Sequence, residues 1–410
     1  MSYTAVMSTA SPDLFLPTIQ HSDFPAPTPS YTKFMKTKKF KIAIDVSPLS
    51  DGNSVRGIGY YTKNLVEALQ HEIKTNPDYQ DFQIDLIENC KLKIENYDLI
   101  HYPYFDPFFL TLPLTKTPFI VTVHDLIPIQ IAKTIPVGLL TKLFPKGLFP
   151  KIFPIGIKGF LKWQIQKYKL KKAKYLLTIS HTSKYIIHDI LNYPKDKIFT
   201  TYLAADPSFK MITNSQLLQN IKTKYNLPDK FILYLGDIGR NKNIPRLAKA
   251  CLKLKVPLII AGSSAVKKVP NDPWTKDIKW VQNNQSKYLK SIGFPDDDDK
   301  PVIYNLATIY CQPSLSEGFG LPLLEAMQCG TPTCFSQHTA LAEVSDYSGL
   351  SFDPYSIPDI AKKLKLVLDN NKLRQELIDK GLKRAKCFSW QLCAINTLAV
   401  YRLCQLNAQK

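Results

Sequence analysis

Residues 316–332 combine glycines and acids in a pattern that suits an anionic, sugar-containing ligand. Their sequence is SEGFGLPLLEAMQCGTP, directly after a predicted strand. Pro322 suits the first turn of a helix and Gly330 suits its end. Glycines let a ligand approach the backbone, and a helix start offers free N–H groups to a phosphate. Glu317 and Glu325 could accept hydrogen bonds from sugar hydroxyls. The block predicts a nucleotide-sugar site, whereas a lone Gly-Phe-Gly would favour a capped helix with two solvated acids.

Other clusters of chemically capable residues also lie just after predicted strands. In open parallel sheets, ligands bind outside the carboxyl ends of the strands. Two such domains facing each other would bring the clusters into one cleft. The clusters are Gly57-Ile58-Gly59, His124-Asp125, Ser180, Gly236 to Lys242, and Gly262-Ser263.

Short β-branched runs alternate with longer helical stretches along the chain, which predicts parallel α/β units. The strands expected in the first half are Phe40–Val46, Ile84–Ile87, Leu99–Tyr102, Phe119–Val123, Tyr175–Ile179 and Ile198–Tyr202. Those expected in the second half are Phe231–Leu235, Leu258–Ala261, Ile278–Val281, Ile309–Gln312, Thr333–Phe335 and Leu350–Phe352.

The rhythm of strands restarts at Phe231 after a polar stretch, 206–230, which we expect to be an interdomain linker. We therefore expect two doubly wound, Rossmann-like domains. The predicted boundaries are a disordered extension at 1–37, an acceptor-binding domain at 38–205, a nucleotide-sugar-binding domain at 206–386, and a C-terminal helix at 387–410 that crosses back to the first domain.

The formal net charge of +19, from 53 basic and 34 acidic residues, implies an anionic partner. Eight cysteines show neither C-x-x-C pairs nor zinc-type spacing, so we expect a cytoplasmic protein without a structural metal. The acidic run 296–299 favours a solvated loop over a metal site, because contiguous acids cannot all face one ion. The sequence contains no uninterrupted run of about eighteen apolar residues, so we predict no transmembrane helix.

The block at 316–332 resembles the E-x7-E motif of the retaining glycosyltransferases of family 4, which have the GT-B fold. Other segments are similar to this family in the same order, so the resemblance spans residues 40–405. They are Lys41–Asp45 with Arg56–Tyr61, Val123–Pro128, Thr178–Ser180 with Ser183-Lys184, Tyr234–Asn243, and Phe388–Trp390.

The resemblance implies roles at the matched positions. Glu325 would bind the ribose hydroxyls of the donor and Glu317 its sugar, while Lys242 and Arg240 would neutralise the diphosphate. The commonest family pattern places arginine where this sequence has Asp237 or Asn241, so Arg240 departs from that pattern.

His124 resembles the family histidine that lies between the donor sugar and the acceptor, and we expect it to position the sugar rather than to act as a base. An isolated histidine there would instead be a strand-end cap, and we interpret His101 as structural. The implied catalytic residues are His124, Glu317, Lys242 and Arg240. The implied donor-binding residues are Gly57, Gly59, Gly236, Ser263, Phe319, Gly320, Leu321 and Glu325, with no metal and no cofactor besides the donor.

Residues 138–174 interleave lysines with Phe, Leu, Ile and Trp, as interfacial membrane segments do. For 144–154 we favour membrane contact. For 162–174 a helix that packs its apolar face on the sheet, with its lysines in water, is a serious alternative to membrane contact. This stretch predicts a protein held peripherally on the inner face of a membrane.

The resemblance to family 4 implies a retaining, metal-independent hexosyltransferase. GDP-mannose is our first choice of donor, with a UDP-sugar as the alternative. The acceptor would be a lipid-linked glycan or a polysaccharide. A nucleotide-sugar epimerase of the same fold is one alternative. A non-catalytic nucleic-acid-binding protein is another, but the positive charge is dominated by lysine and we expect no nucleic-acid partner.

Overall fold

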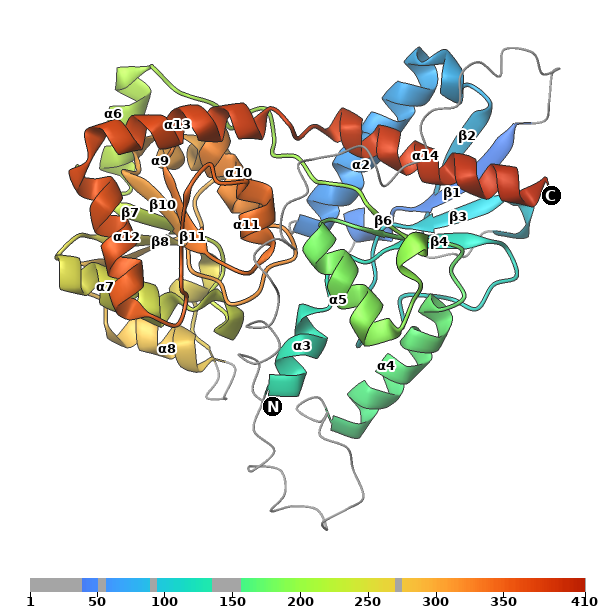
Figure 1. Ribbon diagram of the computed structural model, residues 1–410, viewed down its shortest axis with the longest axis horizontal. Coiled ribbons are helices and arrows are strands. Elements are labelled where there is room, and N and C mark those ends of the chain that lie inside the picture. Colours follow the sequence, from blue (N-terminus) through green and yellow to red (C-terminus); the bar gives the residue numbers. More distant parts are fainter. Residues whose placement is uncertain (1–38, 51–56, 89–93, 135–155, 270–274, 410) are drawn as a thin grey trace, which may run out of the picture. The chain divides into compact units, whose positions relative to one another are not determined.

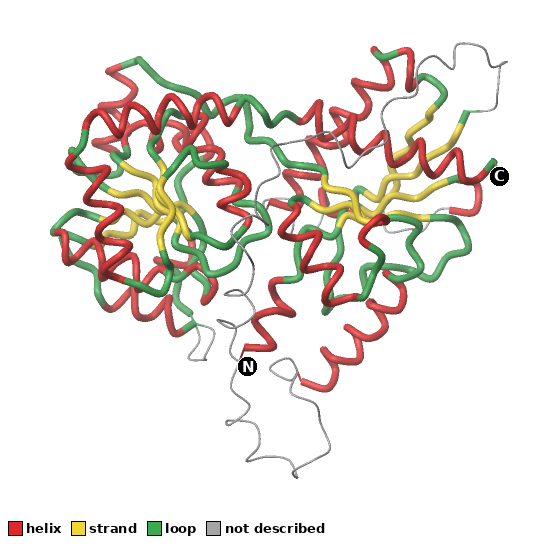
Figure 2. The backbone as a smooth tube through the Cα atoms, viewed as in Figure 1, coloured by secondary structure: helices red, strands yellow, loops and turns green. Residues whose placement is uncertain are grey.

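The computed structural model describes residues 39–50, 57–88, 94–134, 156–269 and 275–409, which form two compact units. The C-terminal unit comprises Ala204–Ser389. The N-terminal unit comprises the described residues up to Leu203, together with those from Trp390 onward. Each unit contains a parallel six-stranded sheet with helices on both faces (Figure 1, Figure 2), which confirms the predicted doubly wound α/β class.

The sheet of the N-terminal unit has the strand order β2-β1-β3-β4-β5-β6. Its strands are β1 (Phe40–Asp45), β2 (Phe82–Ile87), β3 (Leu99–Tyr102), β4 (Phe119–Thr122), β5 (Leu176–Thr178) and β6 (Ile198–Thr200). Its helices are α2 (Gly57–Thr75), α3 (Ile127–Thr134), α4 (Gly156–Leu170), α5 (His181–Leu191) and α14 (Trp390–Ala408), with single 3₁₀ turns at Ser47–Leu49, Pro77–Tyr79, Ile94–Asn96 and Lys195–Lys197.

Alternation along the central strands distributes side chains between two helical layers. Ile100 and Tyr102 of β3 join a core cluster with Trp163 of α4 and Ile187 of α5 on one face. His101 points to the opposite face, where α14 packs on α2. The helix at the far end of the sequence is therefore an integral part of the N-terminal unit.

The sheet of the C-terminal unit has the order β12-β11-β10-β7-β8-β9. Its strands are β7 (Ile232–Leu235), β8 (Leu258–Ala261), β9 (Leu289–Gly293), β10 (Ile309–Gln312), β11 (Thr333–Ser336) and β12 (Leu350–Phe352). Its helices are α6 (Ser215–Lys224), α7 (Ile244–Leu254), α8 (Lys276–Asn283), α9 (Lys300–Leu306), α10 (Leu321–Gln328), α11 (Ala340–Ser345), α12 (Ile357–Asp369) and α13 (Asn371–Ala385), with 3₁₀ turns η8 (Arg240–Lys242), η9 (Ser263–Ala265) and η10 (Asp297–Asp299).

Helical periodicity explains how the outer layers attach to this sheet. Helix α7 buries Ile244, Leu247, Ala248 and Cys251, at spacings of three and four residues, against the sheet and α12. On the other side, α10 packs against α9 and α13. The central strand β7 is thus covered on both faces by helices.

The predicted strand Ile278–Val281 is wrong, because these residues lie in α8. Ile278 and Val281 are the buried positions of that helix, and their spacing of three residues is helical rather than extended. The true edge strand, β9, was not predicted. Only Leu289 is fully buried in it, so it carries almost no hydrophobic pattern.

The polar stretch 206–230 is not a plain linker. It contains α6, which packs on α9 in the C-terminal unit. Asp296, Asp297 and Asp298 of the acidic run are exposed before α9, in agreement with the predicted solvated loop. The Lys224 ammonium lies 2.8 Å from the Asp296 carboxylate and 2.6 Å from that of Asp299. Asp299 is buried, and its carboxylate also accepts a hydrogen bond from the Tyr225 hydroxyl.

None of the described helices is both long enough and apolar enough to span a bilayer. The predicted extension at 1–37, and the 144–154 part of the expected membrane segment, lie outside the described residues.

Candidate functional site

Three neighbouring strands of the C-terminal sheet, β8, β7 and β10, end at the same edge and carry most of the predicted site residues. Hydrogen bonds join their loops. The Ile238 amide after β7 donates to the Ser264 hydroxyl after β8 at 2.7 Å. The Leu315 amide after β10 donates to the Asn241 carbonyl at 2.6 Å. The three loops are therefore one connected platform.

Glu317 lies in this platform as a buried carboxylate with three partners. The Lys242 ammonium is 2.7 Å from its Oε1, which also accepts hydrogen bonds from the Ser314 hydroxyl at 2.6 Å and the Gln312 amide at 2.8 Å. Burial alone would raise the pKa of Glu317, but the positive charge of Lys242 and the three donors outweigh it, so the pKa is lowered. Glu317 is therefore ionised, and it holds Lys242 at the strand ends.

Helix α10 begins beside Glu317 at a glycine that no other residue could replace without strain. Gly320 has a φ of 104°, and a Cβ built on it would lie 2.3 Å from Leu341 Cδ2. Leu321 is the first residue of α10, and Pro322, which has no N–H, follows it. The amides of Leu323 and Leu324 already donate to the Gly320 carbonyl, at 2.9 and 3.3 Å. Among the described residues, this leaves the amides of Gly320 and Leu321 to donate to an anion at the positive end of the helix.

Glu325 lies one turn into α10, half-buried, and its Oε2 accepts a hydrogen bond from the Tyr304 hydroxyl at 2.8 Å. Burial raises the pKa of Glu325 to about 7, despite the hydrogen bond from Tyr304. A carboxyl held in this state can exchange a proton or accept hydroxyl donors close to neutral pH.

The remaining predicted residues of this unit have different environments. Arg240 is exposed at the start of η8. The Ser263 hydroxyl donates to the Asp237 carboxylate at 2.9 Å, so it is already engaged within the platform. Phe319 is 3% exposed and packs edge-on against Phe388, with ring centroids 5.8 Å apart. Its side chain belongs to the core, which leaves only its backbone for a ligand.

Gly236 directly follows β7 and has a φ of 141°, a conformation that favours glycine. Its N–H donates to the Ala261 carbonyl of β8 at 2.9 Å. The residue thus lets the chain turn sharply from the central strand into the platform loop.

In the N-terminal unit, His124 follows β4 with both ring nitrogens buried. Among the residues that the structure describes, neither nitrogen has a hydrogen-bond partner. The ring packs edge-on against Tyr61 of α2, with centroids 4.7 Å apart. Burial lowers the pKa of His124 to about 4, so the imidazole is neutral near pH 7, with one N–H donor and one acceptor nitrogen.

Gly57 and Gly59 lie in the first turn of α2 rather than in a loop after β1. Gly57 is exposed, and a Cβ added to it would meet no atom of the described residues within 4 Å, whereas Gly59 is buried. Glycine is tolerated in the first turn of a helix, because the N–H groups there make no intrahelical hydrogen bonds. A pair of glycines is therefore compatible with either a loop or a helix start. Arg56 lies outside the described residues.

His101 belongs to a buried polar network, in keeping with a structural role. Its Nδ1 is 2.7 Å from the Tyr401 hydroxyl of α14 and its Nε2 is 2.8 Å from the Thr122 hydroxyl. Thr122 is also 3.0 Å from the Tyr61 hydroxyl. The network fixes the ring of Tyr61 that contacts His124.

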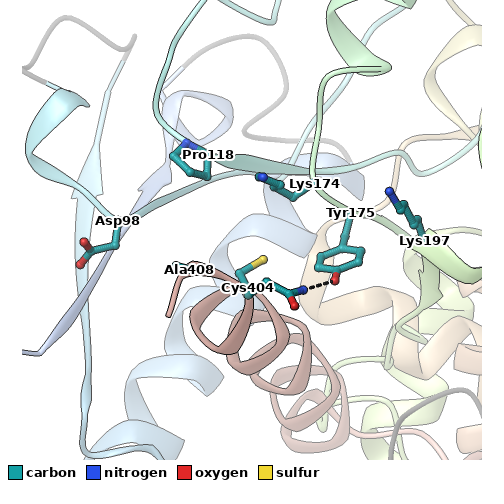
Figure 3. A pocket seen from close by; sticks show the side chains of 8 residues that line it. Asp98, Pro118, Lys174, Tyr175, Lys197, Cys404 and Ala408 are labelled. Carbon is teal, nitrogen blue, oxygen red and sulfur yellow. Dashed lines mark hydrogen bonds between the residues drawn. The ribbon is translucent and has the colours of Figure 1, made fainter. Parts of the chain in front are cut away.

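A cavity of about 340 Å³ in the N-terminal unit contains none of the predicted site residues (Figure 3). It lies at the amino ends of β3 to β6, closed by the last turn of α14, where Asn407 donates to the Tyr175 hydroxyl at 2.8 Å. This is the edge opposite to the one where ligands of parallel sheets bind. Its walls are mostly apolar, and its two lysines, Lys174 and Lys197, are exposed. We therefore place the candidate site at the strand-end platform.

Three residues that hold the predicted acids were not identified from the sequence. Gln312 and Ser314 flank the end of β10, and a polar residue ending an otherwise apolar strand could have signalled them. Tyr304 lies in α9 among apolar residues and carries no such signal.

Residues 218–384 match the family described as Glycosyl transferases group 1. The chain is 33% identical over 244 residues to the O-antigen chain mannosyltransferase B of Escherichia coli, covering 57% of this chain and 62% of that protein. It is 29% identical over 297 residues to the serotype-specific mannosyltransferase WbdA of Escherichia coli, covering 70% of this chain and 34% of the relative. The chain thus spans less than two thirds of the length of either relative.

Among solved structures, the fold is similar to that of a sucrose-phosphate synthase from Thermosynechococcus elongatus, with a TM-score of 0.64 and 18% identity over 91% of this chain and 100% of that chain. The two units of the present protein are those of the GT-B fold, as the resemblance to family 4 implied. Residues 218–384 are therefore similar to the group 1 glycosyl transferases, and the chain also resembles two proteins named as mannosyltransferases.

Proposed function

We propose that the protein is a retaining glycosyltransferase that moves mannose from a nucleoside-diphosphate sugar to a lipid-linked glycan or polysaccharide acceptor. The observation that carries this proposal is the Lys242–Glu317 pair, held at 2.7 Å beside the start of α10. The pair places a cation and a fixed carboxylate next to the amides of Gly320 and Leu321, at the strand edge where parallel sheets bind ligands.

The charges of the platform suit a leaving diphosphate. Cleavage of the sugar–phosphate bond leaves negative charge on the diphosphate and positive character on the sugar ring. The Lys242 side chain is 28% exposed, against 9% for Glu317, so the ammonium can bind a phosphate while it keeps its carboxylate partner. We infer that Lys242 and the amides of Gly320 and Leu321 stabilise the leaving group, without requiring a metal ion.

We assign Glu325 to the ribose hydroxyls of the donor and Glu317 to its sugar. The Tyr304 hydroxyl occupies one oxygen of Glu325 and leaves the other available. A neutral His124, with two unpartnered ring nitrogens among the described residues, suits hydrogen bonding to a sugar better than proton abstraction, because its pKa lies near 4. We therefore give His124 a positioning role.

Mannose is our first choice of donor sugar because the relatives in Escherichia coli are named mannosyltransferases. GDP-mannose would be the donor, with a UDP-sugar as the alternative, and no further cofactor is proposed. A lipid-linked acceptor would place the protein on the cytoplasmic face of a membrane, as a peripheral protein.

A donor screen tests this function. The purified protein is incubated with GDP-mannose, UDP-glucose and UDP-N-acetylglucosamine, and release of nucleoside diphosphate is followed with and without a mannose-containing oligosaccharide acceptor. We expect GDP release that depends on acceptor, and an α-anomeric product signal by NMR. A β-linked product would reject retention. Free mannose with no dependence on acceptor would favour the epimerase-like or hydrolytic alternative.

A further inference from the structure

Helix α4 carries exposed apolar side chains along its outer face. Leu161, Ile165 and Tyr168 are 55%, 45% and 59% exposed, and spacings of four and three residues align them on one side of the helix. Trp163 and Leu170 occupy the opposite side and are buried in the core of the N-terminal unit. The helix therefore has its expected buried face and, in addition, a second apolar face. Polar side chains would be the norm there.

The loop between β3 and β4 adds a second group of exposed apolar residues. Phe109, Leu110 and Leu114 are 64%, 56% and 70% exposed. The buried amide of Gln166 in α4 ties this loop to the helix, since it donates to the Phe109 carbonyl at 2.6 Å. The two groups thus belong to one surface, the α4–loop surface, defined by the outer face of α4 and residues 109–114.

Lysines surround this surface. The Lys162 ammonium lies 5.5 Å from the centre of the Phe109 ring and bridges the helix to the loop, while that of Lys172 lies 4.5 Å from the centre of the Tyr168 ring. Lys158 and Lys172 are exposed at the two ends of the apolar stripe. Asp106, the acid within the loop, is engaged by its own backbone, because its Oδ1 accepts from the amide of Phe108 at 2.7 Å.

We propose that the α4–loop surface binds an anionic membrane, with the six apolar side chains entering the headgroup region and the lysines contacting lipid phosphates. A row of leucine, isoleucine and aromatic residues flanked by lysines is the composition that an interfacial element needs. A nucleic acid would use the lysines but would leave the apolar residues unpaired. This inference deepens the membrane part of the proposed function, and it adds a loop that the sequence did not indicate. It does not depend on sugar transfer.

Vesicle flotation tests the proposal with the full-length protein and vesicles of phosphatidylcholine, alone or mixed with phosphatidylglycerol. One variant combines Leu161→Gln, Ile165→Gln and Tyr168→Gln. A second combines Phe109→Ser, Leu110→Ser and Leu114→Ser. The matched control is Leu217→Gln with Leu366→Gln, since both leucines are exposed on helices of the C-terminal unit.

The charge contribution is tested by Lys158→Gln with Lys172→Gln, against Lys63→Gln with Lys74→Gln on α2 of the same unit. Each lysine near an anionic leaflet contributes about 1 kcal/mol, so the first pair should weaken binding roughly 30-fold. Each apolar side chain withdrawn should weaken it about tenfold. Both control pairs should bind like the wild type.

Three results would overturn the proposal: apolar variants that float like the wild type, equal binding to vesicles without phosphatidylglycerol, or α4 variants that lose thermal stability instead of vesicle binding. The last would show that the stripe is covered within the protein. Single-stranded DNA is added as a competitor for vesicle binding. If the protein still binds the vesicles, a nucleic-acid-binding surface is excluded, whereas complete displacement by DNA would favour such a surface. Nucleotide release with a soluble acceptor should be equal in all variants, which separates this proposal from the enzymatic one.

Discussion

Replacing Lys242 by methionine should destabilise the C-terminal unit far more than the loss of an ordinary ion pair. Methionine keeps much of the volume of the lysine side chain but removes the ammonium 2.7 Å from Glu317, whose side chain is only 9% exposed. Leaving a buried charge without its partner costs about 3–5 kcal/mol. The hydrogen bonds from Ser314 and Gln312 remain, so we expect the lower end of this range.

A loss of about 3 kcal/mol corresponds to a fall in melting temperature of about 6–12 °C in a domain of this size. The effect should depend on pH. In the wild type the lowered pKa of Glu317 contributes stability above about pH 4.5, its unfolded value, and this contribution is lost as the pH falls through the folded pKa. The difference between variant and wild type should therefore be complete at pH 7 and shrink as the pH falls below about 4.5.

Differential scanning calorimetry across this pH range measures the effect. The matched control is Lys365→Met, which breaks an exposed pair with Asp369 one helical turn away and should change little. Adding Glu317→Gln to Lys242→Met removes the unpaired charge and should restore part of the stability. If Lys242→Met melted like Lys365→Met at pH 7, the reasoning about a buried, ionised Glu317 would be refuted.

Further changes test the other parts of the site. Glu325→Gln should weaken donor affinity about 10–100-fold by calorimetric titration. Because the pKa of Glu325 is raised to about 7, the wild-type fold loses stability as the pH rises from 4.5 to 7, so this variant should be more heat-stable than the wild type at pH 8 but not at pH 4. Gly320→Ala should cost about 2 kcal/mol or more in urea unfolding, whereas Gly57→Ala should be neutral or stabilising. Burial lowers the pKa of His124 to about 4, so the contribution of this residue to stability is complete above pH 6.5 and is lost as the pH falls towards 4. His124→Gln should therefore flatten the decline in melting temperature over this pH range. An unchanged decline would show that the ring is not buried as described.

Most strands of the two sheets could be predicted from the sequence, because buried parallel strands form short, continuous apolar runs. Four of the predicted strands, among them Leu99–Tyr102 and Ile309–Gln312, have the predicted bounds. The edge strand β9 was missed because it buries little, and α8 was mistaken for a strand because its buried pair, Ile278 and Val281, is β-branched. Edge elements are set by tertiary pairing rather than by their own pattern.

For the site, sequence spacing indicated which residues follow strands but not what holds them. The motif pointed to Glu317 and Lys242, and the structure places them in contact across 75 residues of sequence. That Tyr304 would bond Glu325 depends on how α9 packs against α10, a long-range contact that no local pattern encodes. Similarly, Phe319 looked available within a loop, but tertiary packing against Phe388 buries its ring.

A crystal structure of the protein with GDP-mannose would show directly whether the platform holds the diphosphate. We expect diphosphate oxygens within hydrogen-bonding distance, about 3 Å, of the Lys242 ammonium and of the amides of Gly320 and Leu321, with the ribose hydroxyls on Glu325. A nucleotide bound elsewhere, with the Lys242–Glu317 pair and the start of α10 free of ligand, would contradict this expectation.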